Sequence, residues 1–172
     1  MASLMENLID ILDKEVTEYK AMLELSNKKT PILIKGDIEA LQQITEEEQN
    51  VVDRISNLDR KRAEAMKDVA NVLNKDVHTL KLSAIIDLLE KRPEEQKKLS
   101  KVHDELSEVV RGVSKVNELN QALIKQSLEL VEFDMNLIKS MNSIPQTAEY
   151  GKSALSNGGY NVSMQGGFDA KQ

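Results

Sequence analysis

The sequence predicts an all-α protein: an elongated antiparallel helical bundle or coiled coil of three long helices and one short helix, with a flexible C-terminal tail. Apolar residues recur at three- and four-residue spacings through most of residues 1–142, a period typical of amphipathic helices. The same stretch has few helix breakers, namely Pro31, Pro93, Gly36 and Gly112. Five of the seven glycines in the 172-residue chain follow residue 150 instead. The helical part is therefore predicted to end near residue 142.

A first long helix is predicted over residues 3–35. Its apolar side chains form a single stripe with spacings of three and four: Leu8, Leu12, Val16, Tyr19 and Leu23. Pro31 has no backbone N–H, and its ring crowds the carbonyl four residues earlier. We therefore expect this helix to kink or to end early, near residues 29–30.

A second long helix is predicted over residues 37–74, after a tight turn. Gly36 suits the left-handed conformation that ends many helices. Asp37 is a good N-cap, and Glu39 places a carboxylate in the first turn, where the helix dipole favours it. Because the connection is so short, the first two helices should form an antiparallel hairpin.

A short third helix is predicted over residues 79–92, and a fourth, the longest, over residues 93–141. Pro93 suits the first helical position, and Glu94 and Glu95 follow it in the first turn. At 1.5 Å per residue the fourth helix spans roughly 70 Å, which is too long for a compact domain of this size. It can bury its apolar stripe along the hairpin or in a dimer, so the sequence leaves both a monomer and a homodimer open.

Residues 143–172 differ in composition from the helical part. They are rich in Gly, Ser, Asn and Gln, yet they hold three of the five aromatic residues: Tyr150, Tyr160 and Phe168. A segment with so little apolar surface cannot offset the entropy of folding alone. We expect a tail that is disordered or becomes ordered on a partner.

Composition argues against several classes of function. The chain has no cysteine and two histidines, so it lacks a thiolate nucleophile and a Cys-based metal site. Neither His78 nor His103 has the glutamate three residues earlier that a di-iron bundle uses. Acidic residues outnumber basic ones, 29 to 23, without a basic stripe for nucleic acid. With no secretory signal and no apolar run near the ~20 residues of a membrane helix, we expect a cytoplasmic protein that is not an enzyme and has no catalytic residue, metal or cofactor.

Asn117 and Asn120 share one face of the fourth helix, and Asn120 falls on the apolar stripe. An asparagine in a coiled-coil core costs stability but fixes the register of the helices. The two amides therefore either set the register of the bundle or hydrogen-bond to a partner helix. The first interpretation is favoured, and the second stays open.

The second half of the fourth helix has a wider apolar face than one seam needs. Leu130 and Phe133 lie well around the helix from Val131. An uncovered face of this kind on a long helix is typical of a site that binds another helix. Alternatively, the short third helix or the tail covers it.

Three segments carry a family resemblance. They are Lys35–Leu41 followed by Glu46–Gln49, Leu82–Ile86 before Pro93, and Asn117–Leu123 followed by Ser127–Glu129. The most specific feature is the Asn-x-x-Asn-x-x-Leu run with its following Ser-Leu pair. Over most of its length the chain thus resembles the FlgN family of flagellar type III export chaperones. The dipeptide Tyr150–Gly151 and the closing Phe168–Ala170 also look like the tails of Gram-positive members.

The resemblance implies a cytoplasmic, non-enzymatic chaperone. Such chaperones bind the hook–filament junction proteins FlgK and FlgL at their C-terminal helical ends and bring them to the export gate protein FlhA and its ATPase complex. The client surface is then expected on the second half of the fourth helix and the tail. The residues expected to contribute to it are Asn117, Asn120, Leu123, Ser127, Leu130, Phe133, Leu137, Tyr150 and Tyr160. The alternative is a coiled-coil scaffold or adaptor that self-assembles and has no client.

Overall fold

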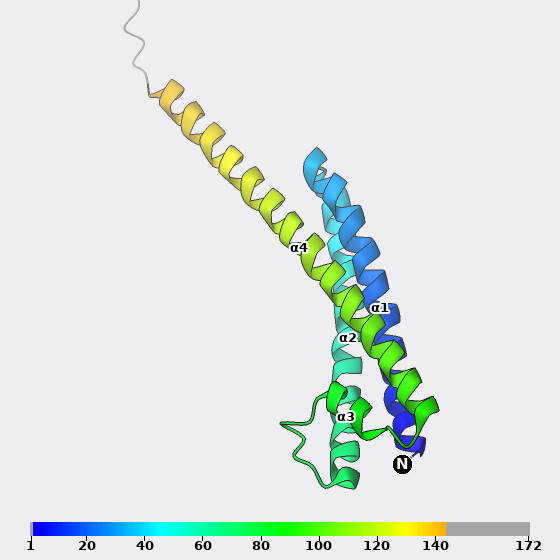
Figure 1. Cartoon of the computed structure of the whole chain (residues 1–172). Coiled ribbons are helices and arrows are strands. Elements are labelled where there is room, and N and C mark those ends of the chain that lie inside the picture. Colours follow the sequence, from blue (N-terminus) through cyan, green and yellow to red (C-terminus); the bar gives the residue numbers. More distant parts are fainter. Residues whose placement is uncertain (1, 144–172) are drawn as a thin grey trace, which may run out of the picture. The chain divides into compact units, whose positions relative to one another are not determined.

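The computed structural model describes residues 2–143 and contains four helices in that range (Figure 1). They are α1 (Ala2–Lys35), α2 (Ile38–Leu73), α3 (Leu82–Leu88) and α4 (Pro93–Asn142). No strand occurs in the described part of the chain, so the predicted all-α class is confirmed. The chain divides into two compact units, Met1–Val131 and Glu132–Gln172. The predicted tail, apart from Ser143, lies outside the described residues.

The turn between α1 and α2 forms as its sequence predicts. Gly36 adopts a positive φ of 68°. Its N–H donates to the Leu33 carbonyl at 3.2 Å, and the Asp37 N–H donates to the Ile32 carbonyl at 3.3 Å, the pair of bonds of a Schellman motif. The Asp37 side chain then accepts from the Ala40 N–H at 3.0 Å and caps α2. These bonds reverse the chain, and α1 and α2 pack together as an antiparallel hairpin (Figure 1).

The expected early end of the first helix is wrong, because α1 continues through Pro31 to Lys35. The carbonyl of Asn27 loses the N–H that residue 31 would normally supply. Asn27 and Pro31 are both exposed, so water can satisfy that carbonyl. One missing bond at the surface is then outweighed by the packing of the last turn.

The third helix is shorter than predicted: Leu82–Leu88 rather than residues 79–92. Before it, the Asp76 carbonyl accepts from the N–H groups of Thr79 and Leu80, so this stretch forms a turn instead of a first helical turn. After it, Pro93 disfavours helical geometry at Arg92. Both ends of the predicted helix are therefore occupied by turns.

Two buried clusters of apolar side chains stabilise the first unit, and each large side chain buried contributes about 1.5–3 kcal/mol. The larger cluster takes residues from all four helices: Met5, Leu8, Ile11, Leu12, Val16, Ala65, Val69, Ile85, Leu89, Leu99, Val102, Leu106 and Val109. The smaller cluster joins α1, α2 and α4 nearer the hairpin turn: Met22, Leu25, Ile44, Val51, Ile55 and Val113. Helix α3 thus packs at one end of the first unit and takes no part in the smaller cluster.

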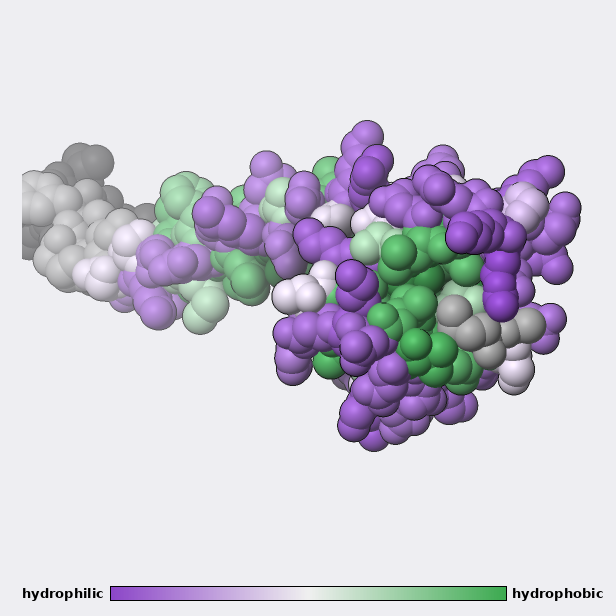
Figure 2. Space-filling model, turned by 60° about the horizontal axis from the view of Figure 1, so that its bottom comes forward, coloured by the Kyte–Doolittle hydropathy of each residue, from purple (hydrophilic) through white to green (hydrophobic). Residues whose placement is uncertain are grey.

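Figure 2 looks onto the end of the first unit that carries α3 and shows apolar side chains gathered there within a polar surround. Val72 near the end of α2 and Leu88 at the end of α3 belong to the exposed apolar residues of these elements. Both lie on helices other than α4.

Candidate interaction surface

A group of polar side chains fixes α4 against α1. Asn120 is only 4% exposed. Its Oδ1 accepts from Thr30 Oγ1 at 2.7 Å, and its Nδ2 donates to the Ser26 carbonyl at 2.9 Å. Ser26, also buried, donates from Oγ to Asn117 Oδ1 at 3.2 Å. Every buried polar group in this set has a partner, as a stable polar network requires. We name Ser26, Thr30, Asn117 and Asn120 the polar lock.

The polar lock gives Asn120 the role that the sequence favoured. A one-residue slip of α4 would take the Asn120 amide away from the Thr30 hydroxyl and the Ser26 carbonyl, and a buried amide left without partners costs about 1–3 kcal/mol. Both polar atoms of Asn120 are therefore used inside the chain. Asn117 is exposed and uses Oδ1 in the lock.

A cavity of about 470 Å³ lies beside the polar lock, between α4 and the hairpin. An ion pair between α1 and α2, Lys29 Nζ to Glu48 Oε2 at 2.6 Å, forms part of its wall. The rest of the wall mixes apolar and amide side chains: Tyr19, Met22, Val52, Ile55, Val113, Ile124, Asn117, Asn120 and Gln121. Such a lining can accept an amphipathic segment that offers both apolar and hydrogen-bonding groups.

Beyond Asn120 the apolar side chains of α4 in the first unit are largely exposed. Leu128 is 64% exposed and Leu130 is 61% exposed. The set that we name the α4 patch comprises Leu119, Leu123, Ile124, Leu128, Leu130 and Val131, of which only Leu123 is half-buried. Exposed apolar surface of this kind is typical of an interaction site.

The sequence left open whether the short third helix covers the apolar face of α4, and the structure answers this. The third helix does not cover it, because Ile85 and Leu89 pack in the larger cluster with the first turns of α1 and the start of α4. The tail, as the other candidate cover, lies outside the described residues.

The second unit contains the last turns of α4, and apolar side chains are exposed there too. Within this unit they are Phe133, Met135, Leu137, Ile138 and Met141.

The remaining predicted site residues are placed as follows. Leu123 and Leu130 belong to the α4 patch, and Phe133 and Leu137 are exposed in the second unit. Ser127 bonds within its own helix, from Oγ to the Leu123 carbonyl at 2.9 Å. Tyr150 and Tyr160 lie outside the described residues. The structure therefore brings Asn117 and Asn120 together with α1 and leaves the leucines unpartnered in the described part of the chain.

Sequence reasoning missed three residues of this region, Ser26, Thr30 and Ile124. The partners of the asparagines, Ser26 and Thr30, continue the α1 stripe three and seven residues after Leu23, but their polarity hid them from an apolar pattern. Ile124 was also missed, although it forms a stripe of its own with Leu128 and Val131, at spacings of four and three residues.

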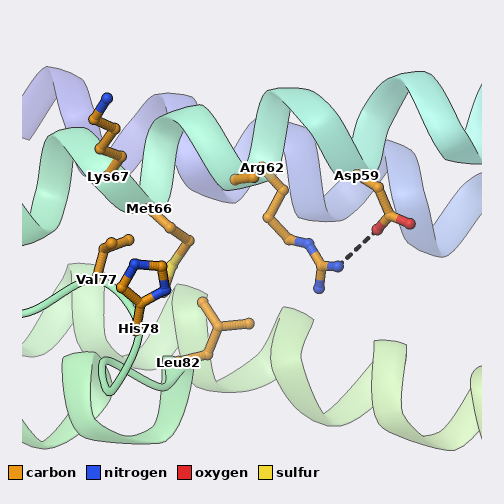
Figure 3. A pocket seen from close by; sticks show the side chains of 8 residues that line it. Asp59, Arg62, Met66, Lys67, Val77, His78 and Leu82 are labelled. Atoms are coloured by element: carbon orange, nitrogen blue, oxygen red, sulfur yellow. Dashed lines mark hydrogen bonds and ion pairs between the residues drawn. The ribbon is translucent and has the colours of Figure 1, made fainter.

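A second cavity, of about 480 Å³, lies between α2 and the segment before α3 (Figure 3). Its wall carries an ion pair, Arg62 to Asp59 at 2.6 Å, beside Met66, His78 and Leu82. The two charged groups of that pair satisfy each other. Among residues 2–143 no three His, Cys, Asp or Glu side chains are grouped to hold a metal ion.

Arg62 also reaches a buried carboxylate on α1. Its Nε lies 3.2 Å from Glu15 Oε1, yet neither oxygen of Glu15 accepts a hydrogen bond in the described structure. Glu15 is 1% exposed. Burial raises the pKa of its carboxyl, the positive charge of Arg62 lowers it, and the negative charge of Asp59 raises it further, so the net direction is upward.

The fold and the α4 patch define an all-helical protein with exposed apolar side chains on one long helix. Its sequence matches the family described as FlgN protein over residues 1–157, and the chain belongs to the FlgN family, whose general role is that of a flagellar export chaperone. No curated protein and no solved structure matches the chain. None of the helices described here is both long and apolar enough to cross a membrane.

Proposed function

We propose that this chain acts in the cytoplasm, without catalysis, as the export chaperone of the junction proteins FlgK and FlgL. It binds their C-terminal helical ends on α4 and delivers them to the export gate FlhA and its ATPase complex. The observation that carries the proposal is the α4 patch, a set of apolar side chains that the described part of the chain leaves exposed, on a helix whose first half packs in the bundle.

The polar lock supports this role because it holds the start of the patch in place. Asn120 is the last buried residue of α4, and Leu123 and Ile124 follow it directly. A client helix therefore meets a surface whose first turn is already ordered, which reduces the entropy lost on binding.

The energetics suit a complex that has to be released. Burying one leucine contributes about 1.5–3 kcal/mol, and the exposed patch offers several such side chains. Ordering a disordered client segment costs about 2–5 kcal/mol of the gross interaction energy. The difference gives an affinity that protects the client but still permits hand-over.

The proposal is tested by titrating the full chain with the C-terminal segment of FlgK from the same bacterium. We expect one-to-one binding, micromolar or tighter, with a negative heat-capacity change from apolar burial. The double variant Leu128→Asp/Leu130→Asp should bind at least about 100-fold more weakly, because charges replace two leucines that the client would bury.

The matched control is Val72→Asp/Leu88→Asp, which places the same charges on exposed apolar positions of α2 and α3. It should bind like the unmodified chain. Binding that survives the α4 double variant would contradict the proposed surface. If the unmodified chain binds neither FlgK nor FlgL but forms a stable oligomer, it is a self-assembling scaffold instead.

A further inference from the structure

One face of α4 runs without interruption from the bundle into the α4 patch. The face comprises Val113, Asn117, Ile124, Leu128 and Val131. At 3.6 residues per turn these five residues lie within roughly 60° of one another around the helix. Val113 is buried, whereas Ile124 is 37% exposed and Leu128 is 64% exposed. The face that packs in the bundle therefore continues into open surface.

The cavity of about 470 Å³ beside the polar lock lies on this same face. Val113, Asn117 and Ile124 line it from α4, and residues of both α1 and α2 form the rest of its wall. The exposed Leu128 and Val131 follow the cavity along α4. A partner helix that packs on these two residues and extends past Ile124 therefore directs one of its ends into the cavity.

The polar groups of the cavity wall favour hydrogen-bond acceptors as their partners. Asn117 uses Oδ1 to accept from Ser26 at 3.2 Å, which leaves its Nδ2 to donate. The carboxylate of Glu48 is paired with Lys29 at 2.6 Å, and the Lys29 ammonium has further N–H groups to donate. The amide of the exposed Gln121 adds another donor. The wall thus offers several donors, while its carboxylate is already paired.

The two ends of a helix differ in what they present to such a wall. The last four carbonyls of a helix have no partner within it, and at the other end the first four N–H groups have none. The C-terminal end also carries the negative pole of the helix dipole. The donors of Asn117, Lys29 and Gln121 therefore match a C-terminal end. The buried Met22 and Ile55 in the same wall suit apolar side chains of its last turn.

We propose that the client docks as an amphipathic helix antiparallel to α4, with its C-terminal end in the cavity between α4 and the hairpin. Its apolar side chains pack on Ile124, Leu128 and Val131. The carbonyls of its last turn accept hydrogen bonds from Asn117 and Gln121. This inference rests on the proposed function and specifies the direction of the bound client helix and the place where it ends.

The direction of the client helix is tested by titrating the full chain with the C-terminal segment of FlgK at low ionic strength. Gln121→Glu should weaken binding by about threefold or more, because a negative charge then meets the negative end of the helix dipole. Gln121→Lys should strengthen binding by a similar factor. The controls are the same two substitutions at Gln43, an exposed residue of α2 outside the cavity wall, and they should leave the affinity unchanged.

Occupation of the cavity is tested by filling it. Val52 lines the cavity from α2 and is 45% exposed, so a larger side chain there need not enter the core. Val52→Trp should weaken binding at least about tenfold, because the last turn of the client can no longer bury its apolar side chains there. Val72→Trp, at a residue of the same helix that is 52% exposed, should bind like the unmodified chain.

The inference is overturned if Val52→Trp binds like the unmodified chain, or if the substitutions at Gln121 have no effect. The opposite order at Gln121 would also overturn it, because the N-terminal end of the client would then lie in the cavity. A change in the oligomeric state of the client-free chain in Val52→Trp would instead place a second copy there. All these results leave the chaperone role intact, whereas absence of any binding by the unmodified chain to FlgK and FlgL would reject the proposed function itself.

Discussion

Replacing Glu15 by leucine is expected to raise the free energy of unfolding by about 2 kcal/mol. Glu15 lies on the buried stripe of α1, three residues after Leu12, and is 1% exposed. Its carboxylate oxygens accept no hydrogen bond in the described structure, so its desolvation is poorly compensated. The substitution does not strand Arg62, because that guanidinium keeps Asp59 at 2.6 Å. Urea unfolding of the two proteins at pH 7 measures the difference.

The same carboxyl makes the stability depend on pH. Its pKa is raised in the folded state, with desolvation as the main cause. Between the ordinary pKa and the raised one, the folded protein holds a proton that the unfolded chain has released, so this group's contribution to stability falls as pH rises through that window. Glu15→Gln cannot titrate. Its stability advantage over the unmodified chain should therefore be small near pH 4.5 and grow toward pH 7.

Asp10→Asn, at an exposed position of α1, is the control for both experiments and should change the free energy of unfolding by less than about 0.5 kcal/mol. A Glu15→Leu protein that is less stable than the original at pH 7 would contradict this account. That result would mean that the ion pair with Arg62 outweighs the cost of burying the carboxylate.

Most of the fold could be predicted because the local signals agree with the final packing. Gly36 and Asp37 determine the hairpin turn through bonds within a few residues, so their effect needs no knowledge of the rest of the chain. The end of α1 and the length of α3 depend instead on solvent exposure and on competing turns. Whether Pro31 stops a helix depends on the exposure of Asn27, and the start of α3 depends on the competing turn at Asp76.

Part of the candidate site could also be predicted, because its signal is local in the sequence. The position of Asn120 on an apolar stripe already indicated a role in fixing the register of the helices, because the spacing that places it there is local. Its partners Ser26 and Thr30 are about ninety residues away in sequence, and no spacing rule connects them to it. Glu15 was missed because a charged residue on an apolar stripe normally marks a solvated edge, and only the packing shows that this carboxylate is buried beside Arg62 of α2.

The substitution Asn120→Ala is expected to lower the free energy of unfolding by about 2–3 kcal/mol. It removes the 2.7 Å acceptor of the Thr30 hydroxyl, which keeps only its longer 3.3 Å contact to the Ser26 carbonyl, and it removes the donation from Asn120 Nδ2 to that carbonyl. It also opens space between α1 and α4 at a point where both are buried. Urea unfolding followed by circular dichroism measures the loss.

Two further variants distinguish the hydrogen bonds of the polar lock from the side-chain packing between α1 and α4. Asn117→Ala removes one 3.2 Å bond at an exposed position and should cost less than about 1 kcal/mol. Asn120→Asp keeps the size and the acceptor but removes the donor to the Ser26 carbonyl, so it should be nearly as harmful as alanine. If Asn120→Asp were as stable as the unmodified chain, the hydrogen bond to that carbonyl would not hold α4 in register. The loss in Asn120→Ala would then be due to the cavity alone, and the start of the α4 patch would owe its order to the apolar contacts around Val113.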